Sequence, residues 1–379
     1  MQASRRRASI HKRTLVSIIC ITYNHEQYIA QALDNFLSQK HDNFDLEVIV
    51  ADDASEDRTQ QIISKYASAF PQTIQPILQE KNVGIQNNLF DALNRAKGQY
   101  IALCEGDDYW INDEKLSMQL SYMEAHHDTT VCFHPVKVLY EGVTKVASAP
   151  EIFPERVFRH SPTRMRLLAT NYIQTNSVMY RRLATYHQPD STILPLDWYL
   201  NILHATTGEV ACVSPDVPLS VYRRHAGGVW WQSSGEEMVF WKKQAIPHLR
   251  MFREVAKLVE ADPKELALLE VTELRTLGDV ITVCLREGDV SLLDRIIDEV
   301  PDRLTAYLSG QQGTINALRI EIGQLKQKYS NESKMLKKNN KDLRAEVERL
   351  RSEATGLHRQ LRNPIAFYGK HAIGKLKEH

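Results

Sequence analysis

The sequence predicts an α/β fold, with a mostly parallel sheet flanked by helices, followed by a helical region and a C-terminal coiled coil. Short β-branched apolar runs alternate with amphipathic stretches between about residues 15 and 230, as in βαβ units. Beyond residue 235 the chain is rich in Leu, Glu and Lys, and apolar residues recur every seven positions from residue 315. These patterns divide the chain into a basic tail (1–14), an α/β domain (15–235), a helical region (236–309), a coiled coil (310–362) and a second basic tail (363–379).

The first third of the α/β domain contains the clearest elements. We expect strands at 15–21, 46–51 and 100–104, and helices at 26–39 and 57–69. Residues 54–57 are small or acidic and so suit the start of the second helix, where side-chain caps and the helix dipole favour them.

Heptad leucines carry the coiled-coil prediction. Leu336, Leu343, Leu350 and Leu357 follow one another at seven-residue spacing, and the eleven-residue step from Leu325 to Leu336 is a stutter. We expect a parallel homodimer or a higher homo-oligomer, because such a seam buries its leucines against another helix. Two alternatives stay open: a single amphipathic helix lying on the globular domain, or a helix that docks a partner protein.

Composition excludes several classes of protein. Lys plus Arg and Asp plus Glu both number 47, so the formal net charge of zero gives no support to a nucleic-acid partner. The five cysteines are widely spaced and odd in number, which suits reduced thiols and a reducing compartment. No apolar stretch is long enough to span a membrane, so we expect a cytoplasmic protein. Apolar residues among the C-terminal lysines would suit a peripheral contact with the inner face of the plasma membrane.

Two pairs of acidic residues follow predicted strands. Asp52 and Asp53 end the second strand, and Asp107 and Asp108 follow the strand at 100–104 through Glu105-Gly106. The carboxyl ends of parallel strands face a common ligand crevice, where paired carboxylates need a cation nearby. Oxygen ligands without flanking Cys or paired His select Mg²⁺ or Mn²⁺, usually together with substrate phosphates. A nucleoside diphosphate is the implied substrate, although either pair could simply be turn and cap residues.

Three segments carry a family resemblance: LVSIICITYNHEQYIAQALDNFLSQ, LEVIVADDASED and NVGIQNNLFDALNRAKGQYIALCEGDDYW. They resemble the nucleotide-binding half (15–110) of family 2 glycosyltransferases, and blocks at 171–182, 195–210 and 218–230 resemble the acceptor half (111–235). The resemblance implies a GT-A fold, a nucleotide-sugar donor with a UDP-sugar as the first expectation, and inversion at the anomeric carbon. The acceptor would be a polysaccharide, a lipid-linked glycan or a protein. The chain lacks the Gln-x-x-Arg-Trp motif of processive synthases, so we expect transfer of a single sugar.

The same resemblance assigns the nucleoside-binding residues. Thr22 and Tyr23 follow the first strand, and Asp52 and Asp53 follow the second. Together they would form the nucleoside surface, with Asp53 accepting a hydrogen bond from the base.

A second group of residues is assigned to the metal and the phosphates. Glu105-Gly106-Asp107-Asp108 stands where the family has a DxD-type motif, with Asp108 as the expected metal ligand and Asp107 at the ribose. His225 is expected to bind the metal or the diphosphate. Arg223 and Arg224 beside it would meet the phosphates through charge-assisted hydrogen bonds.

Asp197 is the expected general base that takes the proton of the acceptor hydroxyl. It resembles the catalytic acidic residue at the start of the helix after the acceptor wall, although an aspartate there could also serve only as a helix cap. Trp198, Trp110 or Tyr109 could stack on a sugar, or pack in the core. Two rival functions stay open: a sugar nucleotidyltransferase, which would carry a Gly-rich loop after the first strand, and a non-catalytic coiled-coil scaffold that binds a nucleotide sugar.

Overall fold

A computed structural model describes residues 13–143, 150–228, 237–303, 305 and 352. The chain divides into two compact units, one formed by Met1–Trp231 with Arg250–Leu269 and the other by Gln232–Leu249 with Glu270–His379. The predicted coiled coil and both predicted tails lie almost entirely outside the described residues.

The first unit is built on a seven-stranded sheet with the order β10-β6-β9-β4-β1-β2-β3. Its strands are β1 (Thr14–Thr22), β2 (Phe44–Asp52), β3 (Ile74–Leu78), β4 (Tyr100–Leu103), β6 (Thr129–Phe133), β9 (Met179–Arg181) and β10 (Glu209–Cys212). Strands β3, β2, β1 and β4 are parallel neighbours, and so are β6 and β10. β9 is antiparallel to both β4 and β6, so the sheet is mixed rather than all parallel.

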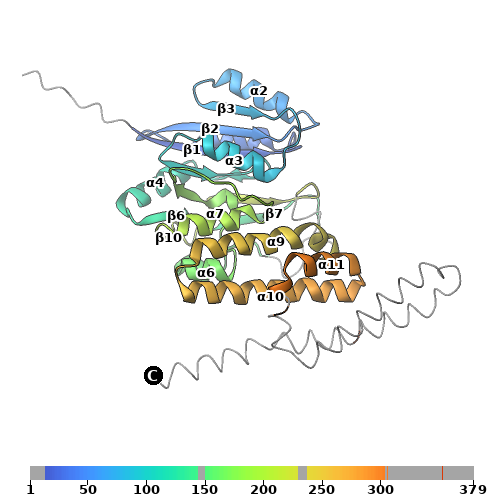
Figure 1. Cartoon of the computed structure of the whole chain (residues 1–379). Coiled ribbons are helices and arrows are strands. Elements are labelled where there is room, and N and C mark those ends of the chain that lie inside the picture. The colour runs from blue at the N-terminus through green and yellow to red at the C-terminus, as the bar shows by residue number, and fades with distance from the viewer. Residues whose placement is uncertain (1–12, 144–149, 229–236, 304, 306–351, 353–379) are drawn as a thin grey trace, which may run out of the picture. The chain divides into compact units, whose positions relative to one another are not determined.

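Helices cover both faces of this sheet, as the alternating apolar residues of its strands require (Figure 1). Val16 and Ile18 of β1 belong to one core with α1 (Ile29–Leu37), α2 (Thr59–Ala69) and α4 (Lys115–Ala125). Ile19 belongs to the other core with α3 (Ile85–Arg95), α6 (Arg164–Ala169) and α7 (Leu196–Ala205). The predicted α/β fold is therefore confirmed.

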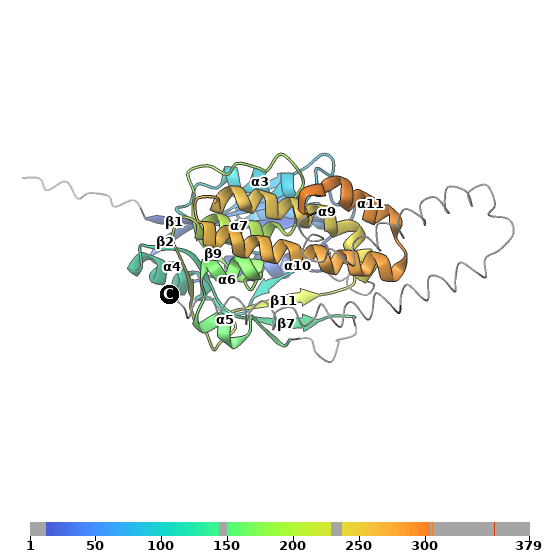
Figure 2. The same cartoon turned by 60° about the horizontal axis from the view of Figure 1, so that its bottom comes forward.

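A second, smaller sheet has the order β5-β11-β7-β8. Its strands are β5 (Tyr109–Trp110), β11 (Ser220–Arg224), β7 (Val136–Tyr140) and β8 (Ile152–Phe153). Two short helical elements, α5 (Arg156–His160) and η1 (Thr175–Ser177), lie between β8 and β9 in the sequence. β11 runs parallel to β7 and antiparallel to β5, and Figure 2 shows β7 and β11 side by side. Because β5 directly follows Asp108, this sheet brings the end of β11 close to the acidic loop.

Three long helices follow: α9 (Glu237–Val259), α10 (Pro263–Glu287) and α11 (Val290–Glu299). Residues 250–269 pack within the first unit, where Phe252 and Val255 are part of its core. Arg164 of α6 donates to Glu265 at 2.6 Å and holds the start of α10 there. The first unit therefore extends beyond the boundary predicted at residue 235. In the second unit, Leu249, Leu277 and Ile296 belong to a separate apolar core.

The described helices include none that combines the length and the apolar character needed to cross a membrane.

Candidate active site

The candidate site lies where β1, β2 and β4 end. Thr22 and Asp52 are register partners at the ends of β1 and β2, and the amide of Gly106 donates to the carbonyl of Ile21 at 3.0 Å. A Cβ on Gly106 would lie 2.7 Å from Thr22 Oγ1 and 2.9 Å from Thr22 Cβ, so glycine is needed for this close approach. The loop after β4 is thereby held against the end of β1.

The first acidic pair fastens loops. Asp52 is fully buried and accepts hydrogen bonds from the amide and hydroxyl of Ser55 and, at 2.7 Å, from Gln60 Nε2. Asp53 accepts the amides of Val83 at 2.7 Å and Gly84 at 3.0 Å, and so anchors the chain that enters α3. Both carboxylates thus hold loops in place, which is the turn-and-cap alternative for this pair. Asp53 keeps only its remaining lone pairs to accept a hydrogen bond from a nucleobase.

The other predicted nucleoside residues differ in exposure. Tyr23 is 41% exposed, which leaves its ring open to a ligand. Thr22 is buried, and its hydroxyl finds no hydrogen-bond partner among the described residues. Neither observation tests the nucleoside role, which stays a prediction.

Asp107 lies between two histidines that are far apart in the sequence. Its Oδ2 is 3.1 Å from His225 Nε2 and 3.7 Å from His25 Nε2. Burial opposes ionisation of Asp107, but the charge of His25 and the hydrogen bond and charge of His225 outweigh it and lower its pKa. His25 is not among the site residues predicted from the sequence. Its place directly after Thr22-Tyr23-Asn24, at the end of a buried strand, is the sequence feature that points to a role in the site.

Asp108 has a structural contact instead. It is buried, and its Oδ1 accepts the backbone amide of Arg223 at 2.7 Å, which fastens β11 to the acidic loop. Burial, followed by the charges of Asp107 and Glu105, raises the pKa of Asp108 well above its usual range. The two aspartates thus differ from the sequence-based expectation, because Asp107 rather than Asp108 faces the histidines.

Glu105 links the acidic loop to the predicted base electrostatically. Burial, followed by the negative charges of Asp107 and Asp197, raises the pKa of Glu105 to about 8. Asp197 lies in the first turn of α7, and its Oδ2 accepts a hydrogen bond from Asn171 Nδ2 at 2.7 Å. Burial raises the pKa of Asp197, while the bond from Asn171 and nearby backbone amides lower it. Asp107 and Asp197 are therefore both within electrostatic reach of Glu105.

Arg223 makes several contacts within the protein, although its Nε, like that of Arg224, has no hydrogen-bond partner among the described residues. Its guanidinium forms a 3.0 Å ion pair with Glu141 and donates to Gln31 at 2.7 Å. It also lies over the rings of Tyr28 and Tyr109, at 4.4 and 5.1 Å from their centroids. These contacts do not support the predicted phosphate-binding role.

Arg224 follows Arg223 on β11, so its side chain lies on the other face of the strand. Its guanidinium lies 5.5 Å from the ring centroid of Tyr222 and 5.7 Å from that of Tyr140. Its Nε is buried and has no hydrogen-bond partner in the described part of the chain. Burial, then the charge of Asp108, raises the pKa of Tyr222, so the acidic loop and Arg224 both lie near this tyrosine.

The predicted aromatic platforms pack inside the protein. Trp110 and Trp198 are buried, and their indole nitrogens donate to the carbonyls of Asn176 at 2.9 Å and Leu167 at 2.6 Å. Tyr109 lies against Arg223. The core-packing alternative holds for both tryptophans.

The donor set at Asp107 limits what kind of metal ion could bind. In the described ranges, no group of three or more His, Cys, Asp or Glu side chains is placed to hold a metal ion. Asp107 and His225 offer one carboxylate and one imidazole. Mg²⁺ and Mn²⁺ commonly use only one or two protein ligands and complete their shell with substrate phosphates and water. The pair therefore fits an ion that binds together with a diphosphate.

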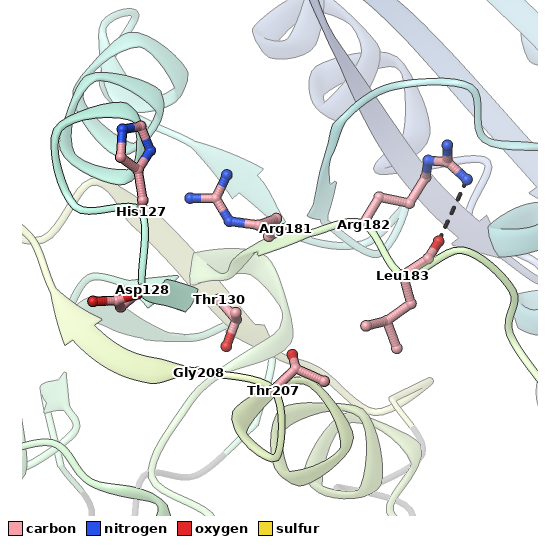
Figure 3. Close-up of a pocket in the computed structure, with 8 residues that line it drawn as sticks. All are labelled: His127, Asp128, Thr130, Arg181, Arg182, Leu183, Thr207 and Gly208. Atoms are coloured by element: carbon pink, nitrogen blue, oxygen red, sulfur yellow. Dashed lines mark hydrogen bonds between the residues drawn. The ribbon is translucent and has the colours of Figure 1, made fainter.

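A separate cavity of about 230 Å³ borders the opposite edge of the sheet (Figure 3). Arg181, which is paired with the start of β4, donates to the Tyr100 hydroxyl at 2.9 Å and to the carbonyl of Met123 at 2.9 Å. Arg182 donates to the carbonyls of Gly98 and, as drawn, Leu183. The candidate site follows the end of β4, so this cavity is not part of it.

The mixed sheet, with helices on both faces, has the α/β architecture of a GT-A-type fold. The sequence profile of Glycosyl transferase family 2 matches residues 17–186. An uncharacterized protein of Mycobacterium tuberculosis, Rv1520, is 41% identical over 283 residues, which are 75% of this chain and 80% of that protein. The chain belongs to glycosyltransferase family 2 and is a glycosyltransferase.

Relatives with assigned names match shorter segments. Poly(ribitol-phosphate) β-N-acetylglucosaminyltransferase TarS of Staphylococcus aureus is 30% identical over 162 residues, 42% of this chain and 26% of TarS. The UDP-Glc:α-D-GlcNAc-diphosphoundecaprenol β-1,3-glucosyltransferase WfaP of Escherichia coli is 38% identical over 110 residues, 29% of this chain and 41% of WfaP. The crystal structure of TarS 1–349 with UDP-GlcNAc has a TM-score of 0.55 at 21% identity, covering 77% of this chain and 81% of that one. This likeness confirms the GT-A-type fold.

Proposed function

We propose that this glycosyltransferase is metal-dependent and inverting, and that it transfers a single sugar from a nucleoside diphosphate sugar to a hydroxyl of a polysaccharide, lipid-linked or protein-linked acceptor. The observation that carries the proposal is the 3.1 Å contact of Asp107 Oδ2 with His225 Nε2, and the charges of both Asp107 and Asp197 act on Glu105 beside it. It supports a single site in which one aspartate serves the diphosphate and the other serves the acceptor.

The donor is proposed to be a UDP-sugar. The names of TarS and WfaP refer to transfer of N-acetylglucosamine and of glucose, and a TarS structure contains UDP-GlcNAc. In this chain, exposed Tyr23 would cover the nucleoside together with Thr22, and the free lone pairs of Asp53 would accept from the base.

Asp107 and His225 would hold a divalent cation, Mn²⁺ or Mg²⁺, together with the donor diphosphate. Such an ion neutralises the negative charge that develops on the departing diphosphate. The contact between Asp107 and His225 supports Asp107 rather than the expected Asp108 as the carboxylate ligand, and the hydrogen bond from the Arg223 amide supports a structural role for Asp108. Arg224, whose Nε has no partner in the described residues, would add a charge-assisted bond to a phosphate.

Asp197 would accept the proton of the acceptor hydroxyl as that oxygen attacks the anomeric carbon. Attack on the face opposite the leaving diphosphate gives inversion in one displacement. Asp197 lies at the start of α7, and the amides there help to keep its carboxylate ionised despite its burial.

The acceptor and the setting are proposed from the relatives and the sequence. The names of TarS and WfaP refer to a phosphate polymer and a lipid-linked glycan, which supports a surface-polymer or lipid-linked acceptor. We also propose a cytoplasmic homodimer formed through residues 310–362, with a peripheral membrane contact through the C-terminal tail.

Release of nucleoside diphosphate tests the proposal. The full chain would be mixed with Mn²⁺ or Mg²⁺ and a panel of nucleotide sugars, alone and with glycan or lipid-linked acceptors. We expect metal-dependent release of nucleoside diphosphate from one donor. In Asp197→Asn we expect this release to be lost while the donor still binds. Release that survives chelation would contradict the metal role, and a fully active Asp197→Asn variant would contradict the base.

A further inference from the structure

The carboxylate of Asp197 ends a chain of hydrogen bonds that leads from partly buried side chains to a fully buried one. Asn171 Nδ2 donates to Asp197 Oδ2 at 2.7 Å, and Asn201 Nδ2 donates to Asn171 Oδ1 at 3.3 Å. The hydroxyl of Tyr180 donates to Asn201 Oδ1 at 2.7 Å. Three side chains therefore connect the predicted base to β9 in the middle of the sheet.

The direction of every bond in this chain is set at its far end. Tyr180 is 0% exposed, and burial raises its pKa, so its hydroxyl keeps the proton that it donates. Its ring stacks on His204 with 4.0 Å between centroids and 5° between planes, which fixes the position of the hydroxyl. Asn201 must turn its oxygen to Tyr180 and its amide N–H to Asn171, and Asn171 must then turn its own N–H to Asp197.

The backbone positions of these residues make the arrangement rigid. Asp197 and Asn201 are one turn apart on α7, so both side chains lie on the same side of the helix. Asn201 is 1% exposed, so no bulk water competes for its amide. Asn171 precedes η1 and reaches both residues of α7 with the two ends of one carboxamide.

We propose that Asn171 is a positioning residue, which fixes the orientation of the Asp197 carboxylate and favours its ionised form as the base of sugar transfer. The inference rests on the proposed function, since it assigns a task to the neighbour of the proposed base. A carboxylate that accepts an N–H bond loses that bond's full strength when it is protonated, so the bond favours the anion. A flipped Asn171 would instead set its oxygen against the carboxylate, and Tyr180 prevents this flip through Asn201.

Titration of Asp197 tests the inference without any substrate. The full chain, labelled with ¹³C at the aspartate carboxyl carbons, would be titrated by NMR, and the Asp197→Asn spectrum would identify the Asp197 resonance. In Asn171→Leu, which keeps the volume but has no N–H, we expect Asp197 to titrate about one pH unit higher than in the unmodified chain. Equal titration in the two chains would overturn the proposal.

A matched variant separates this effect from general destabilisation. Asn88 is also a buried asparagine, and its Nδ2 donates to the carbonyl of Ala51 at 2.8 Å. We expect Asn88→Ala to lower the melting temperature while leaving the Asp197 titration in place. A shift of the same size in Asn88→Ala would assign the effect to loosened packing and reject the positioning role.

Tyr180→Phe provides a milder variant, should Asn171→Leu fold poorly. It removes one hydroxyl at the far end of the chain, so Asn201 and Asn171 can turn over, and we expect a smaller rise in the Asp197 titration. In assays of nucleoside diphosphate release, the acidic limb of the pH profile of kcat should shift to higher pH in Asn171→Leu and in Tyr180→Phe. The Kd for the donor should stay unchanged in both variants. Full sugar transfer by Asp197→Asn would refute the proposed base itself. If Asp197→Asn is inactive but the Asp197 titration is unshifted in Asn171→Leu and in Tyr180→Phe, only the positioning role is refuted.

Discussion

Asp107 Oδ2 lies 3.1 Å from His225 Nε2, although 118 residues separate the two in the sequence. β5 and β11 create this proximity, because β5 follows the acidic loop and pairs with the strand that precedes His225. Of the acidic pair, Asp107 is therefore the member that contacts His225.

The first prediction concerns this pair. Asp107→Asn should weaken Mn²⁺ binding in the presence of UDP by at least about tenfold, since it removes the carboxylate charge. Isothermal titration calorimetry would measure it. Asp108→Asn is the control: its amide oxygen can still accept the Arg223 amide, and Mn²⁺ affinity should change little. The opposite ranking of the two variants would restore Asp108 as the metal ligand.

Much of the nucleotide-binding half could be predicted from sequence. The expected strands at 15–21, 46–51 and 100–104 correspond to β1, β2 and β4, because fully buried strands appear as continuous apolar runs. The predicted helices at 26–39 and 57–69 are confirmed as α1 and α2, with slightly shorter bounds. Local periodicity was sufficient for these elements.

Long-range pairing could not be predicted in this way. β9 inserts antiparallel between β4 and β6, and no local pattern in its three residues indicates either partner. The same limit explains the site. Which of Asp107 and Asp108 faces the histidines depends on the hydrogen bond between Asp108 and Arg223, 115 residues away. Strand alternation also decides that Arg223, and not Arg224, turns to Glu141.

The second prediction concerns Gly106. An alanine Cβ would lie 2.7 Å from Thr22 Oγ1, and the nearby Thr22 Cβ cannot move away freely, so Gly106→Ala should destabilise the protein by about 1–3 kcal/mol. Urea unfolding measures this change. Gly142→Ala is a useful comparison, since its Cβ would meet nothing within 4 Å and only its positive φ of 65° opposes the substitution. A larger loss at Gly142 than at Gly106 would contradict the proposed close packing.

The third prediction concerns pH. Lys115 is 0% exposed, its Nζ lacks a hydrogen-bond partner within the described ranges, and it lies 4.0 Å from the ring centroid of Trp110. Burial lowers its pKa from 10.5 to about 7. Below pH 7 both folded and unfolded chains are protonated, and the folded state bears the full cost of a buried charge. Between pH 7 and 10.5 the unfolded chain binds more protons, so stability rises with pH.

Lys115→Met should remove this slope. Relative to that variant, the free energy of unfolding of the unmodified chain should rise by about 3 kcal/mol between pH 7 and 10. Denaturant unfolding at several pH values would measure the difference. Substitution of the exposed Lys65 by Met should leave the slope unchanged, and a parallel pH profile for Lys115→Met would refute the prediction.

The fourth prediction concerns residues 310–362. If their heptads form a self-associating coil, deletion of residues 310–379 should reduce the mass in light scattering to that of a single chain. Leu343→Asp with Leu350→Asp in the full chain should act in the same way, because it places charges in the seam. An unchanged mass in both would reject the proposed coil.

The last prediction compares the adjacent arginines of β11. Arg223 is buried and bound to Glu141 and Gln31, and Glu141 is 45% exposed, so Arg223→Gln should cost about 1–3 kcal/mol of stability by removing these contacts. Among the described residues the Arg224 side chain makes ring contacts alone, with Tyr140 and Tyr222, so Arg224→Gln should change stability by less than about 1 kcal/mol. If Arg224 binds a donor phosphate, Arg224→Gln should raise the Kd for UDP by about tenfold, which is about 1.4 kcal/mol. Unfolding curves and UDP titrations of both variants provide the measurement, and a normal UDP affinity in Arg224→Gln would remove this residue from the phosphate site.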